Sequence, residues 1–187
     1  MRLGRTGFTL VELLIVVVIL GLLVGFAAPR IDVTKFKVES AMQAVGSTLL
    51  ATERLAITEQ HDVIVRFDVA NNAMRIHEDR DNDGVIDPGE RVRAMPLGEA
   101  VVFGLGTAPA MPMGPGPITF TKVLNGMPAL VFHRDGSASE AGGFYLTSQR
   151  AAQTGTRPED ARAIQVDRAT GRASWFRYGP PVWRRSF

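Results

Sequence analysis

The distribution of apolar and polar residues changes twice along the chain. An apolar run covers Phe8 to Ala28, with Glu12 as its one charge. From Val38 to about Glu59, apolar residues recur at steps of three, four and seven, the spacing of one helix face. After Gln60, short runs rich in Val, Ile, Phe and Tyr are separated by Asn, Asp, Gly and Pro, as in strands joined by turns. The pattern predicts an α+β fold: a long N-terminal helix, hydrophobic then amphipathic, packed on an antiparallel β-sheet domain.

The β-rich part is divided by two segments that favour neither helix nor strand. Gly104 to Pro117 contains four Gly and four Pro, which predicts a long surface loop, and Ala151 to Asp160 predicts a second irregular segment. The predicted strands are Val63–Phe67, Met74–His77, Val92–Met95, Val101–Phe103, Ile118–Thr121, Leu130–His133, Phe144–Thr147, Ala163–Val166 and Ser174–Tyr178.

The apolar run is long enough for a membrane. As a helix, Phe8 to Ala28 would be about 31 Å long, and Arg2 and Arg5 before it favour a cytoplasmic N-terminus with the rest exported. A secretory signal cleaved near Gly25 to Ala28 is the alternative. Glu12 argues against that alternative, because a carboxylate at mid-membrane depth costs roughly 2.5 to 3.5 kcal/mol, less near the edge, and its presence requires a reason.

Residues 7–12 read Gly-Phe-Thr-Leu-Val-Glu. This hexapeptide resembles the leader of type IV pilins and pseudopilins. The resemblance implies cleavage by prepilin peptidase between Gly7 and Phe8, N-methylation of Phe8, and pairing of Glu12 with the N-terminal amine of a neighbouring subunit during assembly. A charge buried among apolar side chains is tolerable when an opposite charge meets it, so this implied role would explain Glu12.

With this resemblance, the chain divides into four parts. Residues 1–7 are the expected leader peptide, 8–29 the transmembrane and assembly helix, 30–60 an amphipathic helical stalk, and 61–187 the exported β-rich domain. Pro29 either bends a continuous helix, as in many pilins, or ends the membrane helix.

The exported part more loosely resembles the GspH and FimT group of minor pseudopilins. The resemblance rests on an acidic turn, on a Phe followed by an Asp-Gly pair, and on a closing hairpin. Its residues are Asp81, Asp83, Gly84, Asp87, Glu90, Phe132, Asp135, Gly136, Gly171 and Arg172.

Residues 79–90, here called the acidic loop, match the twelve-residue calcium-loop pattern at every ligand position. Gly84 allows the sharp turn, and crowded carboxylates repel one another, which favours a cation. No helical pattern flanks the loop, however, so an ordinary Asp-Gly hairpin turn without metal is an equal alternative. No cofactor is required, and any calcium would be structural. The expected ligands are Asp79, Asp81, Asp83, the Val85 carbonyl, Asp87 and Glu90.

The C-terminal segment is basic and aromatic. Arg with stacking rings suits nucleic-acid binding, and some FimT-like pilins bind DNA through a Gly-Arg-x-Arg element; here Ser174 replaces its second Arg. The favoured interpretation is a last strand that buries Trp175 or Phe176, followed by a solvated tail or a contact to another subunit. The residues considered for nucleic-acid contact are Arg172, Arg184 and Arg185.

Composition excludes several classes of function. The chain has no Cys, so disulfides and thiolate metal sites are excluded. Without Arg2 and Arg5, the remaining Lys and Arg balance the 19 Asp and Glu, so the net charge favours no partner. The three His are isolated, and no phosphate loop or nucleophile motif is present, so no enzyme is expected.

The expected function is a minor pseudopilin or pilin subunit of a type II secretion system or a type IV pilus. It would be a single-pass inner-membrane protein with a periplasmic C-terminal domain before it enters the filament. Its partners would be prepilin peptidase and other pilins, contacted through the N-terminal helix. The alternatives are a filament-tip module that captures DNA or a secreted substrate, and a membrane-anchored exported protein outside any filament.

Overall fold

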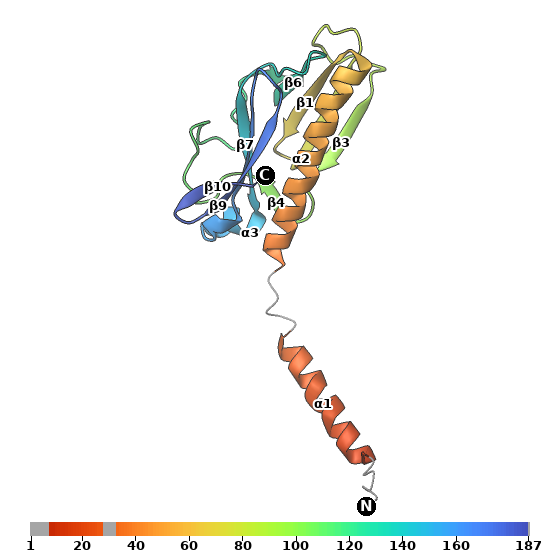
Figure 1. Cartoon of the computed structure of the whole chain (residues 1–187), viewed down its shortest axis with the longest axis vertical. Helices are drawn as coiled ribbons and strands as arrows, with labels where there is room; N and C mark the ends of the chain where they lie inside the picture. Colours follow the sequence, from red (N-terminus) through yellow and green to blue (C-terminus); the bar gives the residue numbers. More distant parts are fainter. Residues whose placement is uncertain (1–7, 28–32, 187) are drawn as a thin grey trace, which may run out of the picture. The chain divides into compact units, whose positions relative to one another are not determined.

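The computed structural model describes residues 8–27 and 33–186, and the chain divides into two compact units, Met1–Val33 and Thr34–Phe187 (Figure 1). The first unit contains one helix, α1 (Leu10–Ala27). Met1 to Gly7 and Pro29, which carry the predicted leader and the predicted bend, lie outside the described residues.

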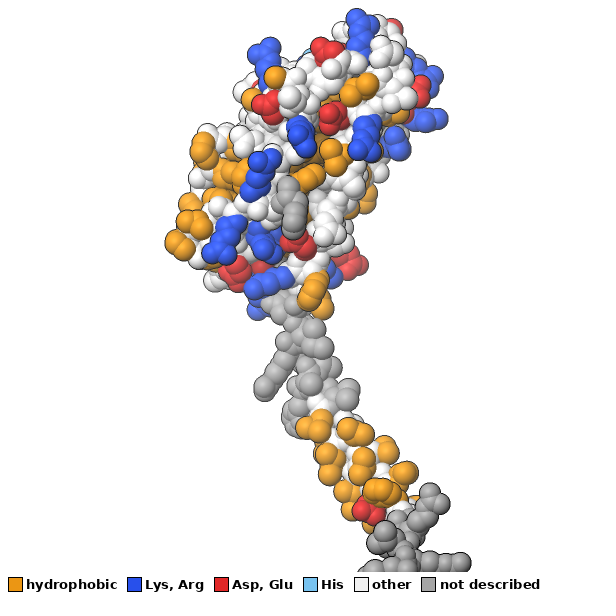
Figure 2. Space-filling view, viewed as in Figure 1, with side chains coloured by type: hydrophobic (Ala, Val, Ile, Leu, Met, Phe, Trp, Pro, Cys, Tyr) orange, Lys and Arg blue, Asp and Glu red, His pale blue; other side chains and the backbone are white. Residues whose placement is uncertain are grey.

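The described side chains of α1 are apolar apart from Glu12. Side chains from Leu10 to Leu23 are exposed, and Figure 2 shows hydrophobic atoms over most of the helix. Within the described ranges, no helix is both long enough and apolar enough to cross a membrane. The predicted membrane-spanning segment therefore stays a prediction.

The second unit begins with α2 (Thr34–Glu59), which confirms the predicted amphipathic helix. One face of α2 is buried against strands of both sheets, including β1 (Asp62–Asp68) and β7 (Gly142–Ser148). The buried residues follow the predicted spacing, with Gly46 and Thr52 added. They are Val38, Ala41, Met42, Val45, Gly46, Leu49, Thr52 and Ala56.

This unit also contains two antiparallel five-stranded sheets, so the α+β class is confirmed. Their strand orders are β3-β2-β1-β6-β5 and β10-β9-β8-β7-β4. The sheets share one core, in which Phe67, Phe103, Phe120 and Phe144 pack ring against ring. The remaining strands are β2 (Ala73–Asp79), β3 (Val92–Pro96), β4 (Val101–Phe103), β5 (Val123–Leu124), β6 (Met127–Phe132), β8 (Arg162–Val166), β9 (Ala173–Gly179) and β10 (Val182–Arg185).

The predicted strand Ile118–Thr121 is wrong. Only Ile118 forms an isolated bridge, to Phe144. The backbone N–H of Thr121 and that of Lys122 are bound by the Glu140 carboxylate at 2.9 Å, in place of a neighbouring strand. Glu140 thus satisfies donors that a sheet would otherwise pair.

Two elements near the C-terminus differ from the predictions. The segment predicted as irregular contains α3 (Gln149–Thr154), capped by Ser148 and ended by Gly155 in the left-handed conformation, and a 3-10 turn, Pro158–Asp160. The residues predicted as a solvated tail form β10, which pairs with β9. Two consecutive prolines, Pro180 and Pro181, lie in the turn between these strands, so the tail folds back as an edge strand.

Candidate functional site

The N-terminal motif lies at the start of α1. Thr9 precedes the helix, and its Oγ1 accepts a hydrogen bond from the backbone N–H of Glu12 at 3.2 Å. A Thr followed three residues later by Glu is the capping-box sequence, and a carboxylate is favoured at a helix N-terminus by the helix dipole. Glu12 is exposed, and so is Phe8, at 80%. The side chain of Glu12 is therefore free to meet a group outside this chain.

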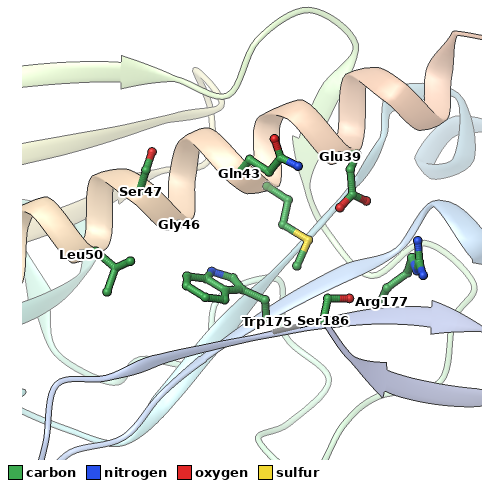
Figure 3. A pocket seen from close by; sticks show the side chains of 9 residues that line it. Glu39, Gln43, Gly46, Ser47, Leu50, Trp175, Arg177 and Ser186 are labelled. Atoms are coloured by element: carbon green, nitrogen blue, oxygen red, sulfur yellow. The ribbon is translucent and has the colours of Figure 1, made fainter.

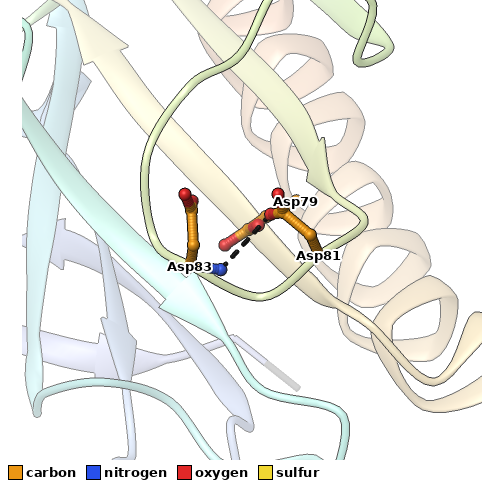
Figure 4. Close-up of side chains that lie close together, drawn as sticks. All are labelled: Asp79, Asp81 and Asp83. Atoms are coloured by element: carbon orange, nitrogen blue, oxygen red, sulfur yellow. Dashed lines mark hydrogen bonds between the residues drawn. The ribbon is translucent and has the colours of Figure 1, made fainter.

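The acidic loop connects β2 to β3, as predicted for a hairpin. It brings together three of the predicted metal ligands: one carboxylate oxygen from each of Asp79, Asp81 and Asp83 lies within 4.8 Å of the other two (Figure 4). Asp79 is only 1% exposed, whereas Asp81 and Asp83 are exposed. The loop therefore has one buried carboxylate, at the end of β2, and two carboxylates exposed to solvent.

Backbone geometry holds the base of the acidic loop in place. Asp79 Oδ2 accepts a hydrogen bond from the N–H of Gly84 at 2.9 Å, and Gly84 has φ of +75°, a conformation that favours glycine. Asp83 Oδ1 accepts from the N–H of Val85 at 2.7 Å. Asp79 Oδ1, by contrast, is buried and has no hydrogen-bond partner in the described structure.

Glu90 closes the loop from the other side. Its Oε1 accepts from the N–H of Arg80 at 3.0 Å, and its Oε2 accepts from the N–H of Asp87 at 3.0 Å and lies 2.5 Å from His77 Nε2. Burial alone would raise the pKa of Glu90, but the hydrogen bonds from Asp87, His77 and Arg80 outweigh it and lower that pKa. Glu90, Asp87 and the Val85 carbonyl are not part of the three-carboxylate group.

Two other carboxylates of the loop are less stable in their charged forms. Burial raises the pKa of Asp79, and a contact with Asp81 raises it further despite the hydrogen bond from Gly84. The pKa of Asp87 is also raised, by desolvation and then by the charges of Asp83 and Asp81. Negative charge in this loop thus lacks full compensation from the described groups.

His77 is the residue of this region whose role the sequence did not reveal. It is completely buried in β2, and its ring contacts Glu90, which is thirteen residues away in sequence. The contact could have been inferred from the register of the β2–β3 hairpin. His77 pairs with Val92, and Glu90 lies two residues before Val92, near the same end of β2. His133 is likewise paired, with Asp62 at 2.7 Å.

The three Arg considered for nucleic-acid contact are exposed and lie in two places in the fold. Arg172 lies between β8 and β9, while Arg184 and Arg185 lie on β10, where Arg185 donates to Ser174 Oγ at 2.9 Å. On the face in Figure 2, basic side chains are interspersed with acidic and apolar ones.

An apolar groove of about 370 Å³ lies between α2 and β9, and no pattern in the sequence indicated it (Figure 3). Trp175 forms one wall, with its indole ring directed at Gly46, and Met42 and Leu50 contribute apolar surface. The predicted burial of Trp175 is confirmed in part, because the ring is half-buried against the core.

The N-terminal part of the chain is similar to a known family of sequences. A family model described as the prokaryotic N-terminal methylation motif matches residues 2–28. This match confirms the resemblance of the leader. No curated protein shows significant similarity to the chain.

Two solved structures of the minor pseudopilin EpsH from the type II secretion system of Vibrio cholerae are similar to the chain. They have TM-scores of 0.46 and 0.47 and sequence identities of 15% and 16%. The matches cover 78% and 79% of this chain and 99% of each EpsH chain.

Proposed function

We propose that the chain is a non-enzymatic minor pseudopilin or pilin, a structural subunit of a filament built by a type II secretion system or a type IV pilus machine. Prepilin peptidase cuts it after Gly7, Phe8 becomes the N-methylated first residue, and the apolar helix holds the chain in the inner membrane until assembly. The observation that carries this proposal is the N-terminal methylation motif over residues 2–28.

The position of Glu12 supports an assembly role. Glu12 lies three residues after Thr9, where a capping box at the start of a helix has either Glu or Gln. Capping alone would therefore be satisfied by an uncharged Gln. The negative charge itself therefore needs another explanation. Pairing with the N-terminal amine of a neighbouring subunit supplies one, since a charge among apolar helices is strongly destabilising unless an opposite charge meets it.

The charge and the helix start can be tested separately. In cells that make this chain together with its own secretion or pilus machinery, we expect Glu12→Gln to keep α1 and to reduce incorporation into sheared filaments at least about tenfold, because one buried charge loses its partner. Incorporation would be measured by immunoblot of the filament fraction against the membrane fraction.

Thr9→Ala is the matched control, because it removes the hydroxyl that accepts from the Glu12 N–H and keeps the carboxylate. This variant should enter filaments at close to the normal level. Normal incorporation of Glu12→Gln would contradict the proposal, as would equal loss in both variants, which would assign Glu12 to helix formation alone.

A further inference from the structure

The acidic loop holds negative charge that the described part of the chain does not neutralise. Three carboxylate oxygens, from Asp79, Asp81 and Asp83, approach within 4.8 Å of one another. Like charges at such separations repel, although solvent weakens the repulsion at Asp81 and Asp83, which are exposed. The arrangement raises the free energy of the loop unless a cation lies among the oxygens.

A second observation points to the same place. Asp79 is 1% exposed, and its Oδ1 has no hydrogen-bond partner among the described groups, although Oδ2 is held by the Gly84 N–H. Leaving a buried carboxylate oxygen unsatisfied is costly, and such atoms in folded proteins call for a water, an ion or a partner. The close-up in Figure 4 shows the Asp79 carboxylate facing the side chains of Asp81 and Asp83.

Backbone N–H groups hold the loop and occupy one oxygen of each of the three carboxylates, namely Asp79 Oδ2, Asp81 Oδ1 and Asp83 Oδ1. Gly84 and Val85 donate their N–H groups to Asp79 and Asp83, and Ile86 packs against the apolar cluster around Ile64. Glu90 is engaged with two backbone N–H groups and His77. Glu90 thus holds the loop closed as a positioning residue and is not one of the three converging ligands.

From this geometry we propose that the acidic loop binds one calcium ion through Asp79, Asp81 and Asp83. The ion neutralises the three carboxylates and fixes the connection between β2 and β3. Calcium accepts six to eight oxygen ligands in a flexible arrangement, and the Val85 carbonyl, Asp87 and water are left to complete the set. Magnesium demands near-ideal octahedral geometry and gives up water reluctantly, so a loop rich in carboxylates favours calcium.

The site can be tested on the full-length chain in detergent, stripped of metal by a chelator. Calorimetric titration with calcium chloride should give saturable binding of one ion per chain, and the melting temperature should rise with calcium more than with the same concentration of magnesium. Asp83→Asn, at an exposed position, should weaken calcium binding at least about tenfold, because affinity depends on the charge count of the ligands.

Asp135→Asn is the matched control. Asp135 Oδ1 accepts a hydrogen bond from the N–H two residues later, as Asp83 Oδ1 does, but Asp135 lies in a different turn. This variant should bind calcium like the unaltered chain. Because the Asn side chain can still accept that turn hydrogen bond, Asp83→Asn is expected to fold, which circular dichroism would check.

Three results would overturn the proposal: no saturable binding at calcium concentrations well above about 1 mM, equal binding by the unaltered chain and Asp83→Asn, or an equal response to magnesium. The proposal does not depend on filament assembly, since binding is measured on the isolated chain.

Discussion

At the scale of single residues, Gly46 determines how α2 meets the second sheet. A Cβ added at Gly46 would lie 2.6 Å from Trp175 Nε1 and 2.9 Å from its Cε2, closer than real contacts allow. The half-buried indole ring packs against the core, which limits how far it can move away from α2. The position of a glycine in the middle of a helix, normally unfavourable, is therefore explained by close packing.

Gly46→Ala should destabilise the second unit by about 1 to 3 kcal/mol, the usual cost of overpacking, despite the better helix propensity of Ala. Thermal and denaturant unfolding, followed by tryptophan fluorescence, would measure the change. Ser47→Ala, at the exposed neighbouring position, should stay within about 0.5 kcal/mol of the unaltered chain. A Gly46→Ala chain as stable as this control would disprove the packing explanation.

Ser148 has two partners at once. Its Oγ accepts from the Ala151 N–H at 3.0 Å and donates to the buried Asp160 carboxylate at 2.7 Å. It thus caps α3 and helps to satisfy a carboxylate that is completely inaccessible.

Ser148→Ala should cost more than an ordinary helix cap, at least about 2 kcal/mol, because it removes the cap and also one donor to Asp160. Equilibrium unfolding in urea would measure it. Gln153→Ala, exposed on the same helix, should change stability little. If both substitutions had the same small effect, the two hydrogen bonds of Ser148 would not contribute to stability as proposed.

At the scale of elements, periodicity predicted most of the second unit. The spacing of Val38, Val45 and Leu49 identified the buried face of α2. Short runs rich in Val, Ile, Phe and Tyr identified the strands of the two sheets except β5 and β10. One predicted strand was wrong at a place where a side chain binds part of the backbone. Ile118–Thr121 has strand-like composition, but Glu140 binds its backbone from eighteen or more residues away. A contact between residues so far apart in sequence cannot be predicted from the local pattern of residues.

The candidate site shows the same division. The spacing of the acidic residues is readable in the sequence, and in the structure one carboxylate oxygen from each of Asp79, Asp81 and Asp83 lies within 4.8 Å of the other two. Asp79 is buried, and Glu90 contacts His77 instead of the other carboxylates. Both features depend on how β2 pairs with its neighbouring strands, so they could not be inferred from the spacing of the acidic residues.

The β1–β2 hairpin contains a pH-dependent contact. Asp68 accepts hydrogen bonds from Asn71 and from the Arg75 guanidinium at 2.8 Å, and these lower the pKa of Asp68. The pKa of Asp68 is lower in the folded state than in the unfolded state, where it is about 4. The hydrogen bonds of Asp68 therefore stabilise the fold fully above about pH 4, and this stabilisation is lost as the pH falls through the folded-state pKa.

Asp68→Asn should therefore lower the melting temperature at pH 7 and reduce the loss of stability on acidification from pH 5 to about pH 2.5. Melting curves of both chains across this range would test it. An unaltered acid dependence in Asp68→Asn would show that other carboxylates account for the acid sensitivity.

At the scale of the whole molecule, the two units have opposite surfaces. From Leu10 to Leu23, α1 exposes apolar side chains with Glu12 as the one charged exception, whereas the second unit buries its apolar residues in a core shared by α2 and two sheets. A folded body attached to an uncovered apolar helix requires a partner for that helix. Membrane storage followed by packing among the helices of other subunits would meet this requirement.

A processed filament subunit has a new, methylated N-terminus, which can be identified chemically. Mass spectrometry of the chain recovered from cells with prepilin peptidase should find an N-terminal peptide that begins at Phe8 and carries one methyl group, and Gly7→Ala should leave the leader attached. A chain that still begins at Met1, or one cut near Ala28, would contradict the account.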